Sequence, residues 1–198
     1  MLGSGMAVRD RRERERAGRH RRIVVVAREL AEDQGWDAVT TRRLAERIEY
    51  SQPVLYGHFP GGKDEIVAAV AVEGFAELAA ALRAAVAGAG PEGAVAALVS
   101  GYLAFAAEQP ATYTAMFDLA TLPFARDDTP APLLEAFAVL RDVLAPAATG
   151  EPDLHAELGW ATLHGLATLA RAGRLPPEGA ADRLALAVDL LAPPRGRP

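Results

Sequence analysis

Residues 51–63, "SQPVLYGHFPGGK", bring together side chains that a hydrophobic core cannot use. A glutamine can hydrogen-bond both N6 and N7 of an adenine, and a proline offers an apolar contact to a thymine methyl group. The hydroxyl of tyrosine and the N–H groups of histidine and lysine suit phosphate oxygens. This chemistry favours DNA binding over catalysis, and its candidate residues are Gln52, Pro53, Tyr56, His58 and Lys63, the only lysine of the chain.

The residues before this stretch predict the helices that would position it. Apolar residues recur at helical spacing from about residue 19, and Gly35 is a natural end for this first helix. A second helix begins at Thr40 or Thr41, whose hydroxyl can accept a capping hydrogen bond. The apolar positions expected to be buried in these two helices are Ile23, Ala27, Leu30, Ala31, Leu44, Ala45 and Ile48.

A third helix begins at Ser51, which can cap it, with Pro53 in the first turn, where a missing N–H costs nothing. Its apolar residues Val54, Leu55 and Phe59 can face inward. Two short helices with a turn of about three residues, packed on a longer helix, form a helix-turn-helix. In that motif the N-terminal part of the second short helix meets base edges in the major groove.

The remainder of the chain is predicted to be helical as well. Amphipathic segments at about 63–86, 91–108, 110–118, 130–147, 152–173 and 177–192 are separated by glycine and proline, and no segment alternates like a strand. The fold class is therefore all-α, with about nine helices. Residues 1–18 lack apolar periodicity and are expected to form a disordered basic arm. A helix-turn-helix domain at 19–64 and a second helical domain at 65–198 should follow.

Charge and composition agree with this division. Residues 1–63 carry 13 of the 21 basic residues but only 9 of the 26 acidic ones, so this part is +4 and the rest is −9. A basic N-terminal part followed by an acidic remainder is typical of a chain whose N-terminal part binds nucleic acid while the rest has another function. The chain has no cysteine, which excludes disulfides and thiolate metal sites. Without a signal peptide or a membrane-spanning apolar run, the expected location is the cytoplasm.

The run "TTRRLAERIEYSQPVLYGHF" at residues 40–59 resembles the DNA-reading head of the TetR family, and the likeness covers about residues 19–66. It implies phosphate contacts from Thr40, Tyr56, His58 and Lys63, and base contacts from Arg42, Gln52 and Pro53. The full predicted DNA-binding set is Thr40, Thr41, Arg42, Ser51, Gln52, Pro53, Tyr56, His58 and Lys63.

Two departures from the family pattern stand beside this likeness. Ile48-Glu49 replaces the small Ala-Gly pair that is usual at the turn, and the loop before Lys63, "PGG", is one residue longer than is common. Lys63 opens the next helix, whose N-terminal N–H groups also favour an anion.

In the body, "WATLHGLATL" at residues 160–169 resembles the WHG type of TetR C-terminal domain, which implies ligand binding and dimerisation. The last two helices are apolar on more than one face and need cover on both sides. The core can cover one side and a twofold-related copy the other, as a four-helix interface of a homodimer. The predicted interface is Leu154, Leu158, Ala161, Gly165, Leu169, Leu184 and Val188.

Aromatic residues gather between positions 102 and 124. Core packing and the wall of a small-molecule pocket are both open interpretations, since each needs apolar side chains at this spacing. His164 is the candidate polar group of such a pocket, although a satisfied core histidine is the alternative. The predicted pocket for a small apolar effector is Tyr102, Phe105, Tyr113, Met116, Phe117, Trp160 and His164.

The predicted function is a ligand-responsive transcriptional regulator, most simply a repressor, that binds a palindromic operator in double-stranded DNA. No cofactor, metal, membrane or catalytic residue is expected. One alternative is a nonspecific nucleoid-type DNA-binding protein, which would share the basic N-terminal part. Another is a helical metal-dependent enzyme, suggested by Glu151 and His155 four residues apart, but Pro152 interrupts the turn and no third ligand is clear.

Overall fold

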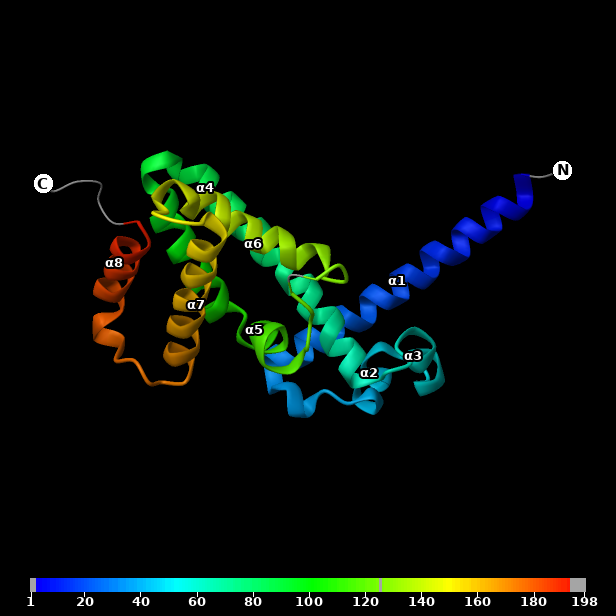
Figure 1. Ribbon diagram of the computed structural model, residues 1–198. Helices are drawn as coiled ribbons and strands as arrows, with labels where there is room; N and C mark the ends of the chain where they lie inside the picture. The colour runs from blue at the N-terminus through cyan, green and yellow to red at the C-terminus, as the bar shows by residue number, and fades with distance from the viewer. Residues whose placement is uncertain (1–2, 125, 193–198) are drawn as a thin grey trace, which may run out of the picture. The chain divides into compact units, whose positions relative to one another are not determined.

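The computed structural model describes residues 3–124 and 126–192, and over that range the chain forms eight α-helices and no strand (Figure 1). The all-α prediction is confirmed. The expected helices at 63–86 and 91–108 are joined as α4 (Lys63–Glu108), which is interrupted where Gly90 takes φ 68° ahead of Pro91. No described helix combines the length and apolar character needed to cross a bilayer.

The chain divides into two compact units. We call residues up to 71, with 114–121, the head, and residues 72–113 with those from 122 onward the body. The head therefore takes in the first turns of α4 and the segment 114–121, both of which lie beyond the boundary predicted at residue 64. α4 belongs to both units, since its residues 63–71 are in the head and its residues 72–108 in the body.

α1 (Gly3–Gln34) is much longer than the sequence predicts, because residues 3–18 continue the helix instead of forming a disordered arm. Arginine and glutamate are good helix formers, and pairs four residues apart support the extension. Arg11 donates to Glu15 at 2.9 Å, and Arg9 lies 3.8 Å from Glu13. Met1 and Leu2 of the predicted arm lie outside the described residues. At the other end Gly35, with φ 79°, ends the helix as predicted.

α2 (Thr41–Ile48) and α3 (Gln52–His58) form the helix-turn-helix against α1. Thr40 caps α2, since its Oγ1 accepts from the Arg43 N–H at 3.2 Å. Ser51 holds the N-cap position of α3, but its hydroxyl makes no capping bond, so that part of the prediction is wrong. Glu49 takes the left-handed conformation with φ 59°, which costs about 1–2 kcal/mol for a non-glycine residue.

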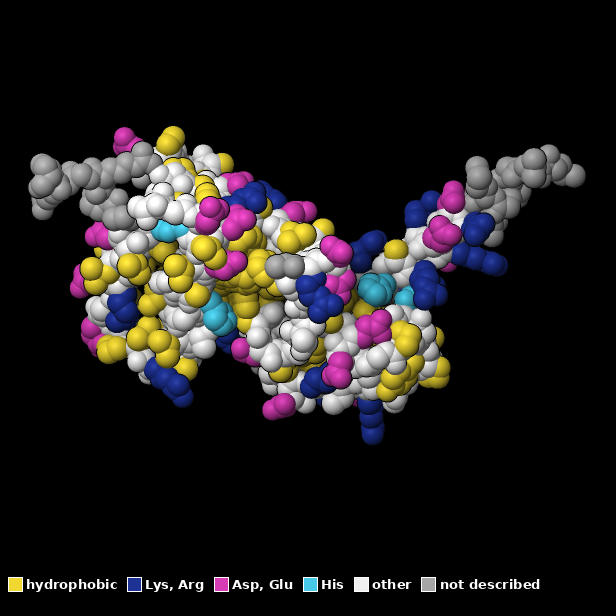
Figure 2. Space-filling model, viewed as in Figure 1, with side chains coloured by type: hydrophobic (Ala, Val, Ile, Leu, Met, Phe, Trp, Pro, Cys, Tyr) yellow, Lys and Arg dark blue, Asp and Glu magenta, His cyan; other side chains and the backbone are white. Residues whose placement is uncertain are grey.

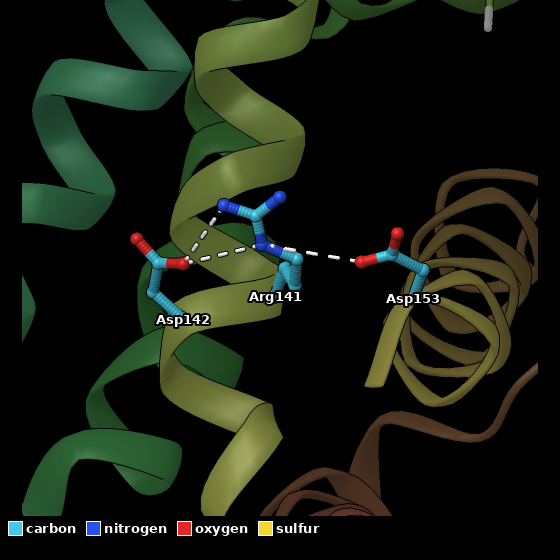
Figure 3. Close-up of polar contacts among 3 residues, drawn as sticks. All are labelled: Arg141, Asp142 and Asp153. Carbon is cyan, nitrogen blue, oxygen red and sulfur yellow. Dashed lines mark hydrogen bonds and ion pairs between the residues drawn. The ribbon is translucent and has the colours of Figure 1, made fainter. Parts of the chain in front are cut away.

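The body packs α6 (Ala131–Leu144), α7 (Pro152–Arg171) and α8 (Ala180–Leu191) with residues 72–108 of α4. Gly159 of α7 marks a close approach to α6, because a Cβ there would lie 2.5 Å from Cδ1 of the fully buried Leu144. At the surface, Arg141 of α6 lies 3.2 Å from Asp142 and 4.0 Å from Asp153 of α7 (Figure 3). These exposed ion pairs contribute little to stability. The fit around Gly159 therefore fixes α7 more than charge does.

The remaining helical pieces are short. α5 (Pro110–Thr114) runs into a π-helical turn, η2 (Ala115–Leu119). The 3₁₀ turns η1 (Trp36–Ala38), η3 (Ala145–Ala147) and η4 (Pro177–Gly179) lie between longer helices.

Candidate functional site

The outer face of α3 presents the residues predicted to read bases. Gln52 and Pro53 are its first two residues and are exposed, and Tyr56, one turn later, is 46% exposed. Leu55 and Phe59 are completely buried and fix the opposite face, as predicted. Val54 was expected to face inward, but it is 40% exposed, because successive helical residues point about 100° apart and Leu55 occupies the buried direction.

The start of α2 holds the other predicted contacts. Thr40 uses its hydroxyl as the cap described above, and Thr41 is half-buried. Arg42 is exposed and donates to Glu46 at 3.0 Å along the same helix. Arg43, outside the predicted DNA-binding set, donates to Gln34 Oε1 at 2.6 Å and to the Ala38 carbonyl at 3.2 Å. It ties the start of α2 to the end of α1.

Tyr56 leans over the loop that precedes α4. Gly62 takes φ 63° there, and a Cβ on it would lie 3.5 Å from the Tyr56 ring and 3.9 Å from the Thr41 methyl group. The Gly61 N–H donates to Glu65 at 2.8 Å. The longer "PGG" loop is thus an ordered turn whose second glycine serves both a positive φ and a close approach of the tyrosine.

Lys63 points into the head. Its ammonium donates to the Trp36 carbonyl at 2.6 Å, and the side chain is half-buried. The bond joins the first residue of α4 to the turn after α1. The two remaining N–H donors of the ammonium are still available to an anion, since a lysine has three.

His58 ends α3 beside α1. Its Nδ1 is buried with no hydrogen-bond partner among the described residues. The His20 ring lies 6.3 Å from the His58 ring and is stacked on Phe59 at 4.3 Å. Burial lowers the pKa of His58 below its ordinary 6.5, and the positive charges of Arg16 and Arg19 and the neighbouring His20 lower it further.

In the body, a chain of hydrogen bonds joins four of the predicted pocket residues. Trp160 Nε1 donates to the Tyr102 hydroxyl at 3.2 Å, the Tyr102 and Tyr113 hydroxyls are 3.0 Å apart, and Tyr113 lies 2.8 Å from His164 Nδ1. Trp160 can only donate, so every hydrogen is used if Tyr102 donates to Tyr113 and Tyr113 to His164. Burial raises the pKa of Tyr102 to about 12, so its hydroxyl keeps its proton. We call this set the tyrosine network.

One open space in the body lies beside the tyrosine network. A cavity of about 190 Å³ is lined mainly by apolar side chains of α4, α7 and α8, with Arg171 and Arg183 in its wall. Arg171 also lies 5.1 Å above the Tyr113 ring. Phe105 is buried, and Met116 and Phe117 belong to segment 114–121 of the head. Sequence reasoning missed the cavity because its lining is mostly alanine and leucine: Leu103, Ala106, Ala107, Leu166, Ala167, Ala170, Leu175, Ala180 and Leu184.

An apolar stripe runs along the outside of α7. Leu154 is 58% exposed and Leu158 68% exposed, and Ala161 and Leu169 continue the stripe at helical spacing, with the half-buried Gly165 between them. On α8 the exposed leucines are Leu186 and Leu190, neither of which belongs to the predicted interface. Leu184 lies in the cavity wall instead, and Val188 is half-buried. Apolar side chains gather over α7 and α8 in Figure 2.

The metal-site alternative gains no support. No three histidine or carboxylate side chains gather as a metal site within the described part of the chain. His155 Nε2 lies 3.0 Å from the Leu191 carbonyl, and that bond ties α7 to the end of α8.

Comparison with known proteins assigns both parts of the chain. Residues 23–70 match the family described as "Bacterial regulatory proteins, tetR family", and residues 95–191 match "Tetracyclin repressor-like, C-terminal domain". A 37-residue stretch is 51% identical to the class C tetracycline repressor protein of Escherichia coli. That match covers 19% of this chain and 17% of the relative.

Solved structures agree over most of the length. A protein of unknown function from Rhodococcus sp. RHA1 is 26% identical, with a TM-score of 0.72 over 87% of this chain and 92% of its own. A transcriptional regulator of the TetR/AcrR family from Thermobifida fusca is 22% identical, with a TM-score of 0.62 over 91% of this chain and 100% of its own. At this identity the second likeness shows the fold alone.

The lowered pKa of His58 predicts a pH-dependent part of the head's stability. The unfolded chain binds a proton at this residue near pH 6.5, and the folded head binds it only at lower pH. The contribution is therefore complete above pH 6.5 and is lost as the pH falls through the folded pKa. Chemical denaturation between pH 7.5 and 5 should show a smaller decline in the free energy of unfolding for His58→Gln than for the natural chain. His155→Gln is the control, and an unchanged pH profile for His58→Gln would contradict the assignment.

Proposed function

The chain belongs to the TetR family of DNA-binding transcriptional regulators that respond to ligands, and from this premise we propose that it is a homodimeric repressor. It binds a palindromic operator through α3 and leaves it when a small apolar effector enters the body. The observation that carries the proposal is the free outer face of α3, where Gln52, Pro53 and Tyr56 are exposed while Leu55 holds the helix in the core. A regulator of this kind acts on DNA in the bacterial cytoplasm and needs no catalytic step.

Base reading is proposed for the first turn of α3. Gln52 stands at the helix start with its amide in solvent, where it can pair with adenine N6 and N7, and Pro53 beside it can touch a thymine methyl group. Thr40, Tyr56 and Lys63 have hydroxyl or ammonium donors that suit phosphates and are proposed to contact the backbone of the same duplex. Arg42 joins them if the DNA displaces its exposed bond with Glu46.

Replacing Gln52 distinguishes sequence-specific base contacts from nonspecific DNA binding. Gln52→Ala should relax specificity at one base position of each half-site at a cost of about 1–3 kcal/mol. Tyr56→Phe removes only a phosphate donor and should weaken all duplexes alike. Competition between a palindromic fragment, taken from the DNA beside the gene, and random duplex measures both. Equal losses on the two duplexes for Gln52→Ala, or no preference for any palindrome in the natural chain, would favour the nucleoid-type alternative.

Dimerisation is proposed through the exposed stripe of α7 together with α8. An exposed apolar stripe is unfavourable in water, and each leucine side chain that becomes buried contributes about 1.5–3 kcal/mol. Gly165 has no atom within 4 Å of the place where a Cβ would stand, so this part of α7 is open to a partner helix. Two copies meeting there would give the twofold axis that a palindromic operator requires.

A charge in the middle of the stripe tests the interface. Leu158→Glu should convert the dimer to a folded monomer, because Leu158 is 68% exposed within one chain and its replacement leaves the core intact. Leu134→Glu is the matched control, since Leu134 is an exposed leucine on α6 at 46%. Light scattering gives the mass and circular dichroism the fold. An unchanged dimer for Leu158→Glu, or dissociation by both variants, would place the interface elsewhere.

The effector is proposed to occupy the cavity beside the tyrosine network. Leu103, Ala106 and Ala107 of its wall stand on the part of α4 that follows the break at Gly90. The part before the break begins at Lys63, which is bonded to the Trp36 carbonyl of the head. A ligand that favours one arrangement of α4 can thereby bias the spacing of the two reading heads, which must match about one DNA turn, roughly 34–36 Å. The coupling cannot exceed the ligand's differential affinity for the two states, typically about 1–3 kcal/mol.

Blocking the cavity should separate induction from DNA binding. Ala107→Trp places an indole at the exposed side of the cavity and should abolish release by effector while operator binding persists. Ala104→Trp, at an exposed position one turn earlier outside the lining, is the control. Calorimetric titration of an effector found by thermal-shift screening, with and without operator, checks the linkage. Operator DNA should weaken effector binding by the same factor by which the effector weakens operator binding. Equal effector affinities with and without operator would contradict the mechanism.

A further inference from the structure

The N-terminal extension of α1 is rich in arginine, and three of its arginines lie on one face of the helix. Residues 9–22 contain eight arginines and three acidic residues, a net charge of +5. Two of the acidic side chains, Glu13 and Glu15, are paired with Arg9 and Arg11. Arg12, Arg16 and Arg19 recur at spacings of four and three, which places them on one face of the helix. We call these three residues the arginine face, and basic side chains line this part of α1 in Figure 2.

The arginine face is turned toward α3. The Arg16 guanidinium donates to the Gly57 carbonyl at 3.1 Å. Arg12, Arg16 and Arg19 line one concave surface together with Tyr50, Val54, Gly57 and His58. The His58 imidazole has its Nδ1 buried in this region, where no described residue offers it a hydrogen bond. Three cations and an imidazole therefore converge beside the helix proposed to read bases.

An anion would stabilise this convergence of positive charge. The charges of Arg16 and Arg19 oppose protonation of His58. The Glu15 carboxylate on the same helix is exposed and bonded to Arg11, and its charge also acts on Arg12 and Arg19. Guanidinium groups pair with phosphate through two parallel hydrogen bonds, as they do with carboxylate, and DNA phosphates would lie beside the helix proposed to read bases. A phosphate there would also relieve the repulsion around His58.

We propose that the arginine face binds the phosphate backbone of DNA outside the base pairs that α3 reads. Arg12 and Arg19 are about 10 Å apart along the helix axis, at about 1.5 Å per residue. One DNA strand offers a phosphate every 3.4 Å or so of duplex axis, so the face reaches over about three phosphates. This inference rests on the proposed function, since it assumes that α3 lies in the groove. It gives the operator a required flank of sequence-independent duplex.

Two double variants with the same change of charge and the same spacing test the proposal in the full-length chain. R12A/R19A removes the two ends of the arginine face and leaves the Arg16–Gly57 bond intact. R14A/R21A removes two exposed arginines seven residues apart on the opposite side of α1. Alanine is the best helix former, so both variants should keep α1, as circular dichroism can verify.

Binding is measured on a palindrome selected by the natural chain from a random duplex pool, ending at the read bases or extended by about ten base pairs on each side. The natural chain and R14A/R21A should prefer the extended duplex. R12A/R19A should lose that preference and bind about tenfold or more weakly. Its salt slope should fall by about 0.9 for each phosphate that the variant no longer neutralises.

Equal losses of affinity for the two double variants, or no effect of the flank on binding by the natural chain, would overturn the proposal that the arginine face binds DNA.

If the proposed function itself is wrong, the natural chain will select no palindrome from the random pool. In that case the two variants are compared on random duplex. A larger drop in affinity and salt slope for R12A/R19A would retain the arginine face as a DNA-binding surface, and equal drops would refute it.

Discussion

A helix of seven residues has too few internal hydrogen bonds to persist alone in water, so α3 depends on the burial of Leu55 and Phe59. These two side chains determine which face of α3 is exposed to solvent. The DNA contacts proposed for α3 depend on this orientation, because Gln52, Pro53 and Tyr56 are exposed only while Leu55 is buried. His20 of α1 stacks on Phe59, so α1 also helps to hold α3 in place.

Much of the head could be predicted from sequence, because its signals are local. A capping threonine at position 40, a glycine stop at position 35 and the apolar spacing of α1 and α2 each act within a turn or two of the chain. The failures are equally physical. Residues 3–18 have no apolar stripe, yet they extend a helix already nucleated by the buried part of α1, and nucleation is the costly step.

In the candidate sites too, features with a local sequence signal could be predicted and long-range contacts could not. Exposure of Gln52 and Pro53 follows from helical periodicity, whereas the bond from Lys63 to the Trp36 carbonyl joins residues 27 positions apart and has no local signal. For the aromatic residues of the body, composition leaves core packing and a pocket wall both open. The structure joins Tyr102, Tyr113, Trp160 and His164 by hydrogen bonds, and a cavity lined mostly by alanines and leucines lies beside them.

The bond between Lys63 and Trp36 has a practical consequence, because the chain contains no other lysine. The bond to the Trp36 carbonyl holds the half-buried Lys63 side chain against the turn after α1, which limits its access to amine-directed reagents. Labelling at this single side chain therefore reports the opening of the junction between α1 and α4, with no background from lysines elsewhere. The head carries a built-in chemical probe of its own local unfolding, and the label can be read by mass spectrometry in the presence or absence of DNA.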